Sequence, residues 1–186
     1  MKSILFVHIK DPTTDFLEAI YKDRRDCTIV RNNLPVDVMN SLIRNHDQVV
    51  MMGHGSPAGL FGNHMRHIIN EQHVDALAEK DNNVYIWCHA NAFVKEHNLK
   101  GFSTSMFISE HSEATWVLKE TFYPERDEKS IEASNALFAS LVANNLDEPI
   151  ATLAKNVRYH YAAHSHPGIK NQHVVDYNRN GLIFIK

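Results

Sequence analysis

The sequence predicts an α/β fold with a six-stranded, mostly parallel β-sheet. Six apolar runs have the length of strands, and segments with apolar residues at helical spacing separate most of them. Strands that alternate with helices form mostly parallel sheets with helices on both faces. The chain of 186 residues suits one domain with its own core, and no repeat or low-complexity tract divides residues 1–186.

The first half of the chain supplies half of the expected sheet. Three apolar runs are expected strands, at residues 3–9, 27–30 and 48–52. Three segments with helical spacing are expected helices, at residues 16–21, 34–43 and 64–80. Asp11–Thr14 forms a turn with helix-capping residues, and Pro35 suits the start of a helix. Glycines 53, 55, 59 and 62 predict a loop after the third strand.

The second half supplies the other strands and the longest helices. The expected strands are at residues 84–87, 101–108 and 182–185. The expected helices are at residues 92–97, 112–122, 131–144 and 150–161. We expect Trp116 on the inner face of its helix, and we interpret the charged residues 123–129 as a break too short to separate two domains.

Composition excludes several classes of protein. The formal net charge is −3 and no basic block is present, so we expect no nucleic-acid partner. The apolar runs are too short to span a bilayer, and we interpret the apolar N-terminal stretch as the first strand and not as a signal peptide. Cys27 and Cys88 make no disulfide framework, which predicts a reducing, cytoplasmic location.

Two strands end at residues that take part in nucleophilic catalysis. The run Val49–Met52 leads into Gly53-His54-Gly55, and the run Val84–Trp87 leads into Cys88. The active groups of an open α/β sheet gather at the carboxyl ends of its strands. If the two strands are parallel neighbours, His54 and Cys88 face each other as a thiol–imidazole pair.

The chemistry of such a pair needs further groups that the sequence offers. A neutral thiol is a weak nucleophile, and an imidazole and a helix N-terminus both favour its thiolate. The expected short helix begins close behind Cys88. Gly55 has no side chain, so a substrate carbonyl can approach its backbone, and the N–H groups of Gly55 and Cys88 are candidate oxyanion donors.

An apolar strand that ends in His54-Gly55, followed by an apolar strand that ends in Cys88, resembles the caspase-like cysteine peptidases, closest to the bacterial CHAT and gingipain-type domains. The segment 99–110 also looks like the strand after the catalytic cysteine in that family. The resemblance implies a three-layer α/β/α caspase-like fold and a cysteine endopeptidase that needs no cofactor. It implies His54 and Cys88 as the catalytic dyad and Gly55 as an oxyanion donor.

The sequence departs from the caspases around the cysteine. Caspases place Gln-Ala before the cysteine and a glycine two residues after it, whereas Ile86-Trp87 and Ala90 occupy these positions here. The interval between histidine and cysteine is also shorter. These differences favour a small bacterial-type relative over a true caspase.

The resemblance also gives candidate residues for substrate binding. In this family, the end of the first strand and the strand after the cysteine build part of the pocket for the residue before the scissile bond. Lys10 or Asp11 falls at the first place, and Ser109, Glu110 or His111 at the second. Lys10 favours an acidic side chain of the substrate, and Glu110 a basic one, so the preference of the pocket stays open.

Thirteen histidines raise the question of a metal site. His64, His67 and His73 follow the His54 loop, but their spacing matches no zinc motif. His160, His164 and His166 are more typical of a helix end and a loop. We therefore expect no metal, although a histidine-rich metal hydrolase is kept as an alternative.

Two further alternatives follow from the same residues. Gly53–Gly55 is also compatible with a simple turn and Cys88 with a buried apolar residue, which would make the chain an inactive pseudopeptidase or interaction domain. A nucleotide-binding domain is disfavoured because no phosphate-binding glycine motif follows the first strand. The expected partner is a peptide or protein substrate, and pairing of the strand 182–185 at a sheet edge would give a homodimer.

Overall fold

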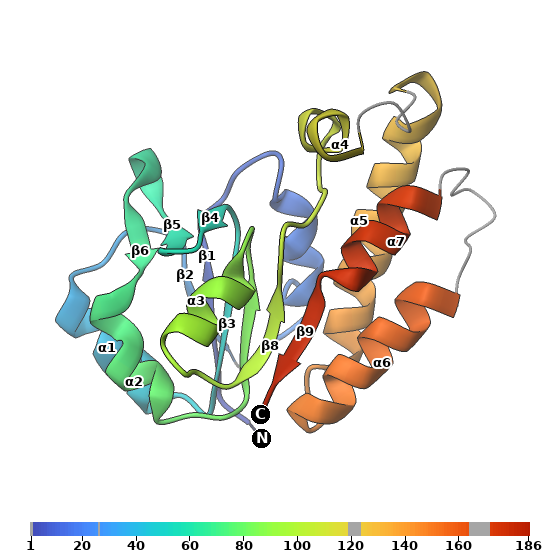
Figure 1. Ribbon diagram of the computed structural model, residues 1–186. Helices are drawn as coiled ribbons and strands as arrows, with labels where there is room; N and C mark the ends of the chain where they lie inside the picture. Colours follow the sequence, from blue (N-terminus) through green and yellow to red (C-terminus); the bar gives the residue numbers. More distant parts are fainter. Residues whose placement is uncertain (1, 26, 119–123, 164–171) are drawn as a thin grey trace.

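A computed structural model describes residues 2–25, 27–118, 124–163 and 172–186 (Figure 1). Six strands of this part form one sheet in the order β2-β1-β3-β7-β8-β9. They are β1 (Ile4–His8), β2 (Cys27–Val30), β3 (Gln48–Met52), β7 (Asn83–Ile86), β8 (Gly101–Thr104) and β9 (Leu182–Ile185). The strands from β2 to β8 pair in parallel, and only β9 is antiparallel to its neighbour. The predicted α/β class with a six-stranded, mostly parallel sheet is confirmed.

Helices cover both faces of the sheet because alternate strand residues point to opposite sides. Phe6 and Val50 enter one apolar core, whereas Leu5 and Val49 enter the other. The first core includes residues from η1 (Asp15–Ile20), α5 (Pro124–Asn145), α6 (Ile150–Ala163) and α7 (Gln172–Asn180). The second includes residues from α1 (Val36–Asn45), α2 (Val74–Ala78) and α3 (Ala90–Glu96).

The prediction of a helix over residues 64–80 is wrong for most of that range. In this range β6 (His67–Ile69) joins β4 (Gly55–Ser56) and β5 (Gly59–Phe61) in a small antiparallel sheet, between the 3₁₀ turns η2 (Asn63–Met65) and η3 (Glu71–His73), and only α2 is α-helical. Ile69 is fully buried opposite Leu60, as β-branched residues of a strand often are. His64 and Met65 have positive φ angles, which a right-handed helix excludes.

The strand expected over residues 101–108 ends early, at Thr104. Beyond it, the backbone N–H of Ser105 donates to the carbonyl of Gly181 over 2.8 Å. The buried side chain of Asn178 then accepts a hydrogen bond from the N–H of Ile108 (2.7 Å) and donates one to its carbonyl (2.9 Å). The segment 105–110 thus leaves the sheet and is held by α7, a helix that the sequence pattern did not predict.

Two expectations about α4 (His111–Leu118) and α5 also need correction. Trp116 is 70% exposed and does not lie on an inner face, because this short helix buries Ala114 instead. The charged segment 123–129 is not a break, since α5 begins at Pro124 and continues through it. Tyr123 itself lies outside the described residues.

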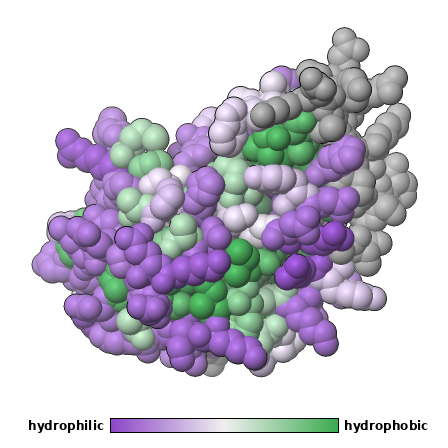
Figure 2. All heavy atoms as spheres, viewed as in Figure 1, coloured by the Kyte–Doolittle hydropathy of each residue, from purple (hydrophilic) through white to green (hydrophobic). Residues whose placement is uncertain are grey.

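The carboxyl ends of β1, β3 and β7 lie at one edge of the sheet, at the top of Figure 1, and both ends of the chain lie at the opposite edge. Hydrophilic side chains cover much of the face seen in Figure 2, and apolar ones reach its surface near the middle, over β8 and β9. Within the described ranges, no helix combines the length and the apolar character needed to cross a membrane.

Candidate active site

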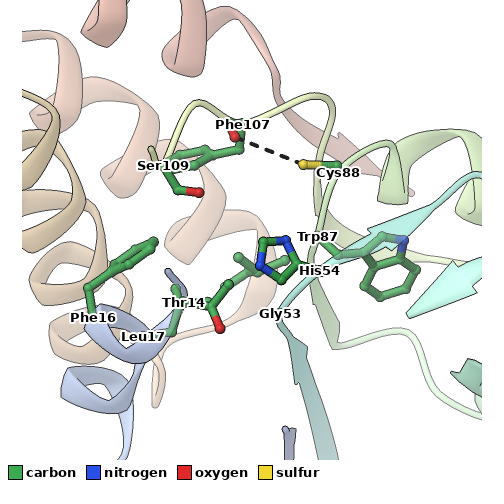
Figure 3. Close-up of a pocket in the computed structure, with 10 residues that line it drawn as sticks. Thr14, Phe16, Leu17, Gly53, His54, Trp87, Cys88, Phe107 and Ser109 are labelled. Carbon is green, nitrogen blue, oxygen red and sulfur yellow. Dashed lines mark hydrogen bonds between the residues drawn. The ribbon is translucent and has the colours of Figure 1, made fainter. Parts of the chain in front are cut away.

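The fold brings the two expected catalytic residues to one pocket. β3 and β7 are parallel neighbours with Met52 opposite Ile86, so His54 and Cys88 follow their carboxyl ends side by side. Both residues line a pocket, here called the dyad pocket, whose other walls come from η1 and from the segment after β8 (Figure 3). The structure therefore places both residues at one pocket, and their pairing as a thiol–imidazole dyad stays a prediction.

Backbone geometry fixes the chain on either side of His54. Gly53 has a φ of 140°, a conformation that other residues rarely adopt, and its N–H donates to the carbonyl of Ile86 over 3.0 Å. The carbonyl of His54 accepts a hydrogen bond from the N–H of Phe61 (2.8 Å). The histidine is thus tied to β7 on one side and to the small antiparallel sheet on the other.

The loop after β1 determines which nitrogen of His54 carries the proton. The hydroxyl of Thr13 donates to Oδ1 of Asp11 over 2.6 Å, and its oxygen lies 2.6 Å from Nε2 of His54. A hydroxyl has one proton, so the Thr13 oxygen accepts from Nε2–H. In this tautomer Nδ1 of His54 has its lone pair free to act as a base.

Asp11 supports this arrangement from a short distance. Its Oδ1 lies 3.5 Å from Nε2 of His54 and also accepts the backbone N–H of Thr13 (3.0 Å). Hydrogen bonds from the hydroxyl and the N–H of Thr13 lower the pKa of the Asp11 carboxyl below its usual value. Asp11 therefore stays ionised at neutral pH beside the imidazole.

Cys88 lies in a different environment. Its Sγ points toward the carbonyl of Phe107, 3.9 Å away (Figure 3), and lies 3.7 Å from Oε1 of Glu113. Burial, and after it the negative charge of Glu113, raises the pKa of the Cys88 thiol to about 12. The sulfur is therefore a protonated thiol in this conformation, and its partners are oxygen atoms and not the imidazole.

The position of Glu113 follows from its role at the start of α4. Its Oε2 accepts hydrogen bonds from the N–H of Ser109 (2.7 Å), the hydroxyl of Ser109 (3.0 Å) and the N–H of Glu110 (3.3 Å). A carboxylate in the first turn of a helix commonly satisfies such free N–H groups. The other oxygen, Oε1, is left to face the thiol of Cys88.

The turn after Cys88 is sharply bent. His89 has a φ of 66° and is exposed, and α3 begins at the next residue, Ala90. The carbonyl of Trp87 accepts from the N–H of Ala90 (3.1 Å) and from the hydroxyl of Thr104 (2.8 Å). The short helix expected behind the cysteine is confirmed, and it has seven residues.

The absence of a side chain at Gly55 makes room for Trp87. A Cβ at this position would lie 2.2 Å from Cδ1 of the indole, whose Nε1–H donates to the carbonyl of Ser56 over 3.0 Å. The residue is therefore needed for packing, whether or not a substrate approaches it. Its role as an oxyanion donor stays a prediction.

The two candidate substrate-binding residues differ in their placement. Lys10 lines a second pocket together with His54, Asp11 and His64, here called the Lys10 pocket, and it lies 3.8 Å from Glu18. Glu110 does not line the dyad pocket, and its Oε1 accepts a hydrogen bond from the hydroxyl of Ser112. Ser109, the residue before it, does line that pocket.

The histidines that suggested a metal site lie apart. His73 is buried and its Nδ1 takes part in a cap with Asn70, and the ring of His67 stacks on Phe61 at 4.8 Å. In the part of the chain that the structure describes, no group of three or more His, Cys, Asp or Glu side chains is placed to hold a metal ion. His160 lies in the last turn of α6, and His164 and His166 lie outside the described residues.

Sequence reasoning missed the roles of Thr13 and Glu113. Asp11-Pro12-Thr13 has the composition of a turn, and the signal that was available is its place at the end of the strand next to β3. For Glu113 the signal is its place in the first turn of the expected helix 112–122, where a carboxylate can accept from free backbone N–H groups. Comparison of the chain with protein-family models, curated proteins and solved structures finds no match.

Proposed function

We propose that the chain is a cysteine endopeptidase of the caspase-like type that uses Cys88 as nucleophile and His54 as its proton carrier. The observation that supports it most is that these two residues follow neighbouring parallel strands and line one pocket. The held tautomer of His54, with Nδ1 free, adds support from a second direction. The order of strands and the helices on both faces agree with a three-layer α/β/α fold.

The proposed reaction has two stages. Nδ1 of His54 takes the proton of the Cys88 thiol as the sulfur attacks the carbonyl carbon of a peptide bond. The C–N bond of the tetrahedral intermediate breaks, and the ring gives its proton to the leaving amine. Water then hydrolyses the thioester, with the same ring as base. The backbone N–H groups of Gly55 and Cys88 are the proposed donors to the oxyanion.

The environment of Cys88 sets a condition on this reaction. The thiol has a pKa of about 12 and faces Phe107 and Glu113 in the structure. For attack, the sulfur must turn from these oxygens toward Nδ1 of His54. A peptide bound in the dyad pocket supplies the energy for this change by replacing the contacts of the resting thiol.

The test is cleavage of a peptide library by the wild-type chain and by two cysteine variants. We expect Cys88→Ala to abolish cleavage, because the nucleophile is lost, and Cys27→Ala to retain it. Mass spectrometry of the products measures both. Equal cleavage by wild type and Cys88→Ala would assign the activity to a contaminant and refute the proposal.

A second candidate is an inactive domain of the same fold that binds other proteins. The high pKa of the Cys88 thiol favours it, since a reactive cysteine ordinarily has a lowered pKa. The two candidates differ in the same library experiment, because an inactive domain cleaves no peptide. We further propose a cytoplasmic location, which agrees with the finding that no disulfide joins Cys27 and Cys88.

Self-association through β9 remains a separate proposal. β9 ends the main sheet as expected, with β8 on one side, and it is only partly buried over Ile183–Ile185. Pairing of two such edges would continue the sheet into a second copy. Light scattering of the purified chain would give twice the monomer mass in that case.

A further inference from the structure

The dyad pocket is walled by apolar side chains. Phe16 and Leu17 of η1 lie on one side and Phe107 on another, with His54 and Cys88 opposite η1 (Figure 3). Ile86 and Trp87, at the end of β7, line it as well. Ser109 and Thr14 are its uncharged polar members. The space between these walls is about 20 Å³, room for about one water molecule, so a side chain that enters beside the nucleophile must move the walls apart and then meets mainly hydrocarbon.

The charged side chains near His54 and Cys88 do not line the dyad pocket. Among the described residues that line the dyad pocket, none is a lysine, arginine, aspartate or glutamate. Lys10 and Asp11 line the separate Lys10 pocket on another side of His54. Oε2 of Glu113 accepts from Ser109 and from the backbone N–H of Glu110, Oε1 faces the thiol of Cys88, and Glu113 does not line the dyad pocket. A charged substrate side chain in the dyad pocket would lose water without gaining an ion pair.

We propose that the substrate residue whose carbonyl Cys88 attacks carries an uncharged, apolar side chain, which the dyad pocket binds against Phe16, Leu17 and Phe107. This inference rests on the proposed peptidase function and names its substrate class. It replaces both charged preferences that Lys10 and Glu110 suggested from the sequence. Phe16 is the specificity-determining residue best suited to a test, because it is only partly buried and lies on η1, away from the dyad.

The test measures cleavage of internally quenched peptides that differ only in the residue before the scissile bond. Leucine, valine and alanine are compared with aspartate, lysine and arginine, using the full chain. We expect kcat/KM for the best apolar peptide to exceed that for each charged peptide by about tenfold or more. A charged peptide cleaved as fast as the apolar ones would overturn the inference and leave the peptidase proposal intact.

Variants at Phe16 test whether the dyad pocket sets the preference for the residue before the scissile bond. Phe16→Asp should bring the lysine and arginine peptides to within about threefold of leucine, since it supplies the missing ion pair, whereas Phe16→Leu should keep the wild-type order. Phe16→Ala, which adds no charge, should shift the preference toward larger apolar residues such as phenylalanine. An unchanged order in both Phe16→Asp and Phe16→Ala would refute the role of this pocket.

The peptide series also distinguishes failure of the apolar preference from failure of the peptidase function. Cleavage that depends on Cys88 but favours a charged residue contradicts only the apolar preference. Absence of Cys88-dependent cleavage for every peptide refutes the peptidase function, and the substrate class falls with it. Circular dichroism of each Phe16 variant establishes that its fold is retained.

Discussion

A carboxylate lies beside each of the two residues of the proposed dyad, with opposite consequences for catalysis. Oδ1 of Asp11 lies 3.5 Å from Nε2 of His54, and Oε1 of Glu113 lies 3.7 Å from Sγ of Cys88. The Asp11 carboxylate holds the Thr13 hydroxyl, whose oxygen accepts from Nε2–H and leaves Nδ1 of His54 free to take a proton. The negative charge of Glu113 raises the pKa of the Cys88 thiol, which hinders a residue that must lose a proton.

The two groups also differ in their access to water. The side chain of His54 is 36% exposed, whereas burial is the largest cause of the raised pKa of Cys88. The histidine is therefore arranged for its task in the resting structure, and the cysteine is not. A thiol and an imidazole at one pocket therefore do not by themselves make a reactive pair.

The largest expected effect concerns the buried histidine His8 at the same edge of the sheet, and it tests whether burial controls the protonation of this ring. His8, at the end of β1, is 1% exposed, and burial lowers its pKa from 6.5 to about 4. Between these values the unfolded chain takes up a proton that the folded chain refuses, so stability falls as the pH falls from 6.5 toward 4. We expect His8→Gln to remove about 2.5 kcal/mol of the difference in stability between pH 7 and pH 4.5.

Urea unfolding at pH 7 and at pH 4.5 measures the slope. Tyr21→Phe is the matched control, since it removes the hydroxyl 2.9 Å from Nδ1 of His8 but keeps the titrating ring. The control should retain the pH dependence. A His8→Gln variant with the wild-type slope would show that burial of this ring does not govern its protonation.

The next largest effect is expected from removing the contact that holds the ring of His54. Thr13→Val removes the hydroxyl that lies between Asp11 and Nε2 of His54, so the tautomer of the ring is no longer held. We expect kcat for a cleaved peptide to fall about tenfold to a hundredfold with little change in KM. Thr13→Ser, which keeps the hydroxyl, should retain most of the activity.

A pH profile distinguishes this positioning role from a general loss of structure. In Thr13→Val, the pH dependence of kcat should change shape, because the environment of the His54 ring has changed. A variant that loses activity equally at every pH, or raises KM alone, would contradict the assignment.

The smallest of the three effects concerns the carboxylate beside Cys88. Glu113→Gln removes the charge beside Cys88 and keeps oxygen and nitrogen atoms for the start of α4. The thiol pKa should fall, and the rate of alkylation of Cys88 by iodoacetamide at pH 8 should rise up to about tenfold. Mass spectrometry of the labelled Cys88 peptide gives the rate.

Glu110→Gln is the comparison for that experiment, since this carboxylate bonds to Ser112 and raises the pKa of the Cys88 thiol less than Glu113 does, so its labelling rate should rise less. In the wild type, the labelling rate should climb throughout pH 7 to 10, because the pKa of Cys88 is about 12. Equal rates in wild type and Glu113→Gln would mean that the charge of Glu113 does not raise the pKa of the thiol.

The sequence pattern predicted the main sheet well because its strands are continuous apolar runs. The small antiparallel sheet was missed because β4, β5 and β6 are only two or three residues long and include turn-forming glycines. α7 was missed because most of its residues are polar, although Val174, Val175 and Asn178 are buried. Helical periodicity is weak evidence in such short or polar segments.

The candidate site could be predicted in part for a related reason. His54 and Cys88 stand directly after predicted strands, so topology alone places them together. The contacts of Thr13 and Glu113 depend on how two loops fold back over the sheet. Local pattern carries no information on such contacts, and neither do the charges of Lys10 and Glu110, which suggested opposite preferences.

The hydrogen bonds between Asn178 and Ile108 have a consequence for the order in which the site forms during synthesis of the chain. Phe107 and Ser109 reach their places in the wall of the dyad pocket next to a backbone group that Asn178 fixes, and Ser105 is tied to the carbonyl of Gly181. A nascent chain has made His54 and Cys88 long before residues 178–181 leave the ribosome. The wall of the pocket is therefore completed only after residues 178–181 have been made, and the proposed cleavage would begin only then.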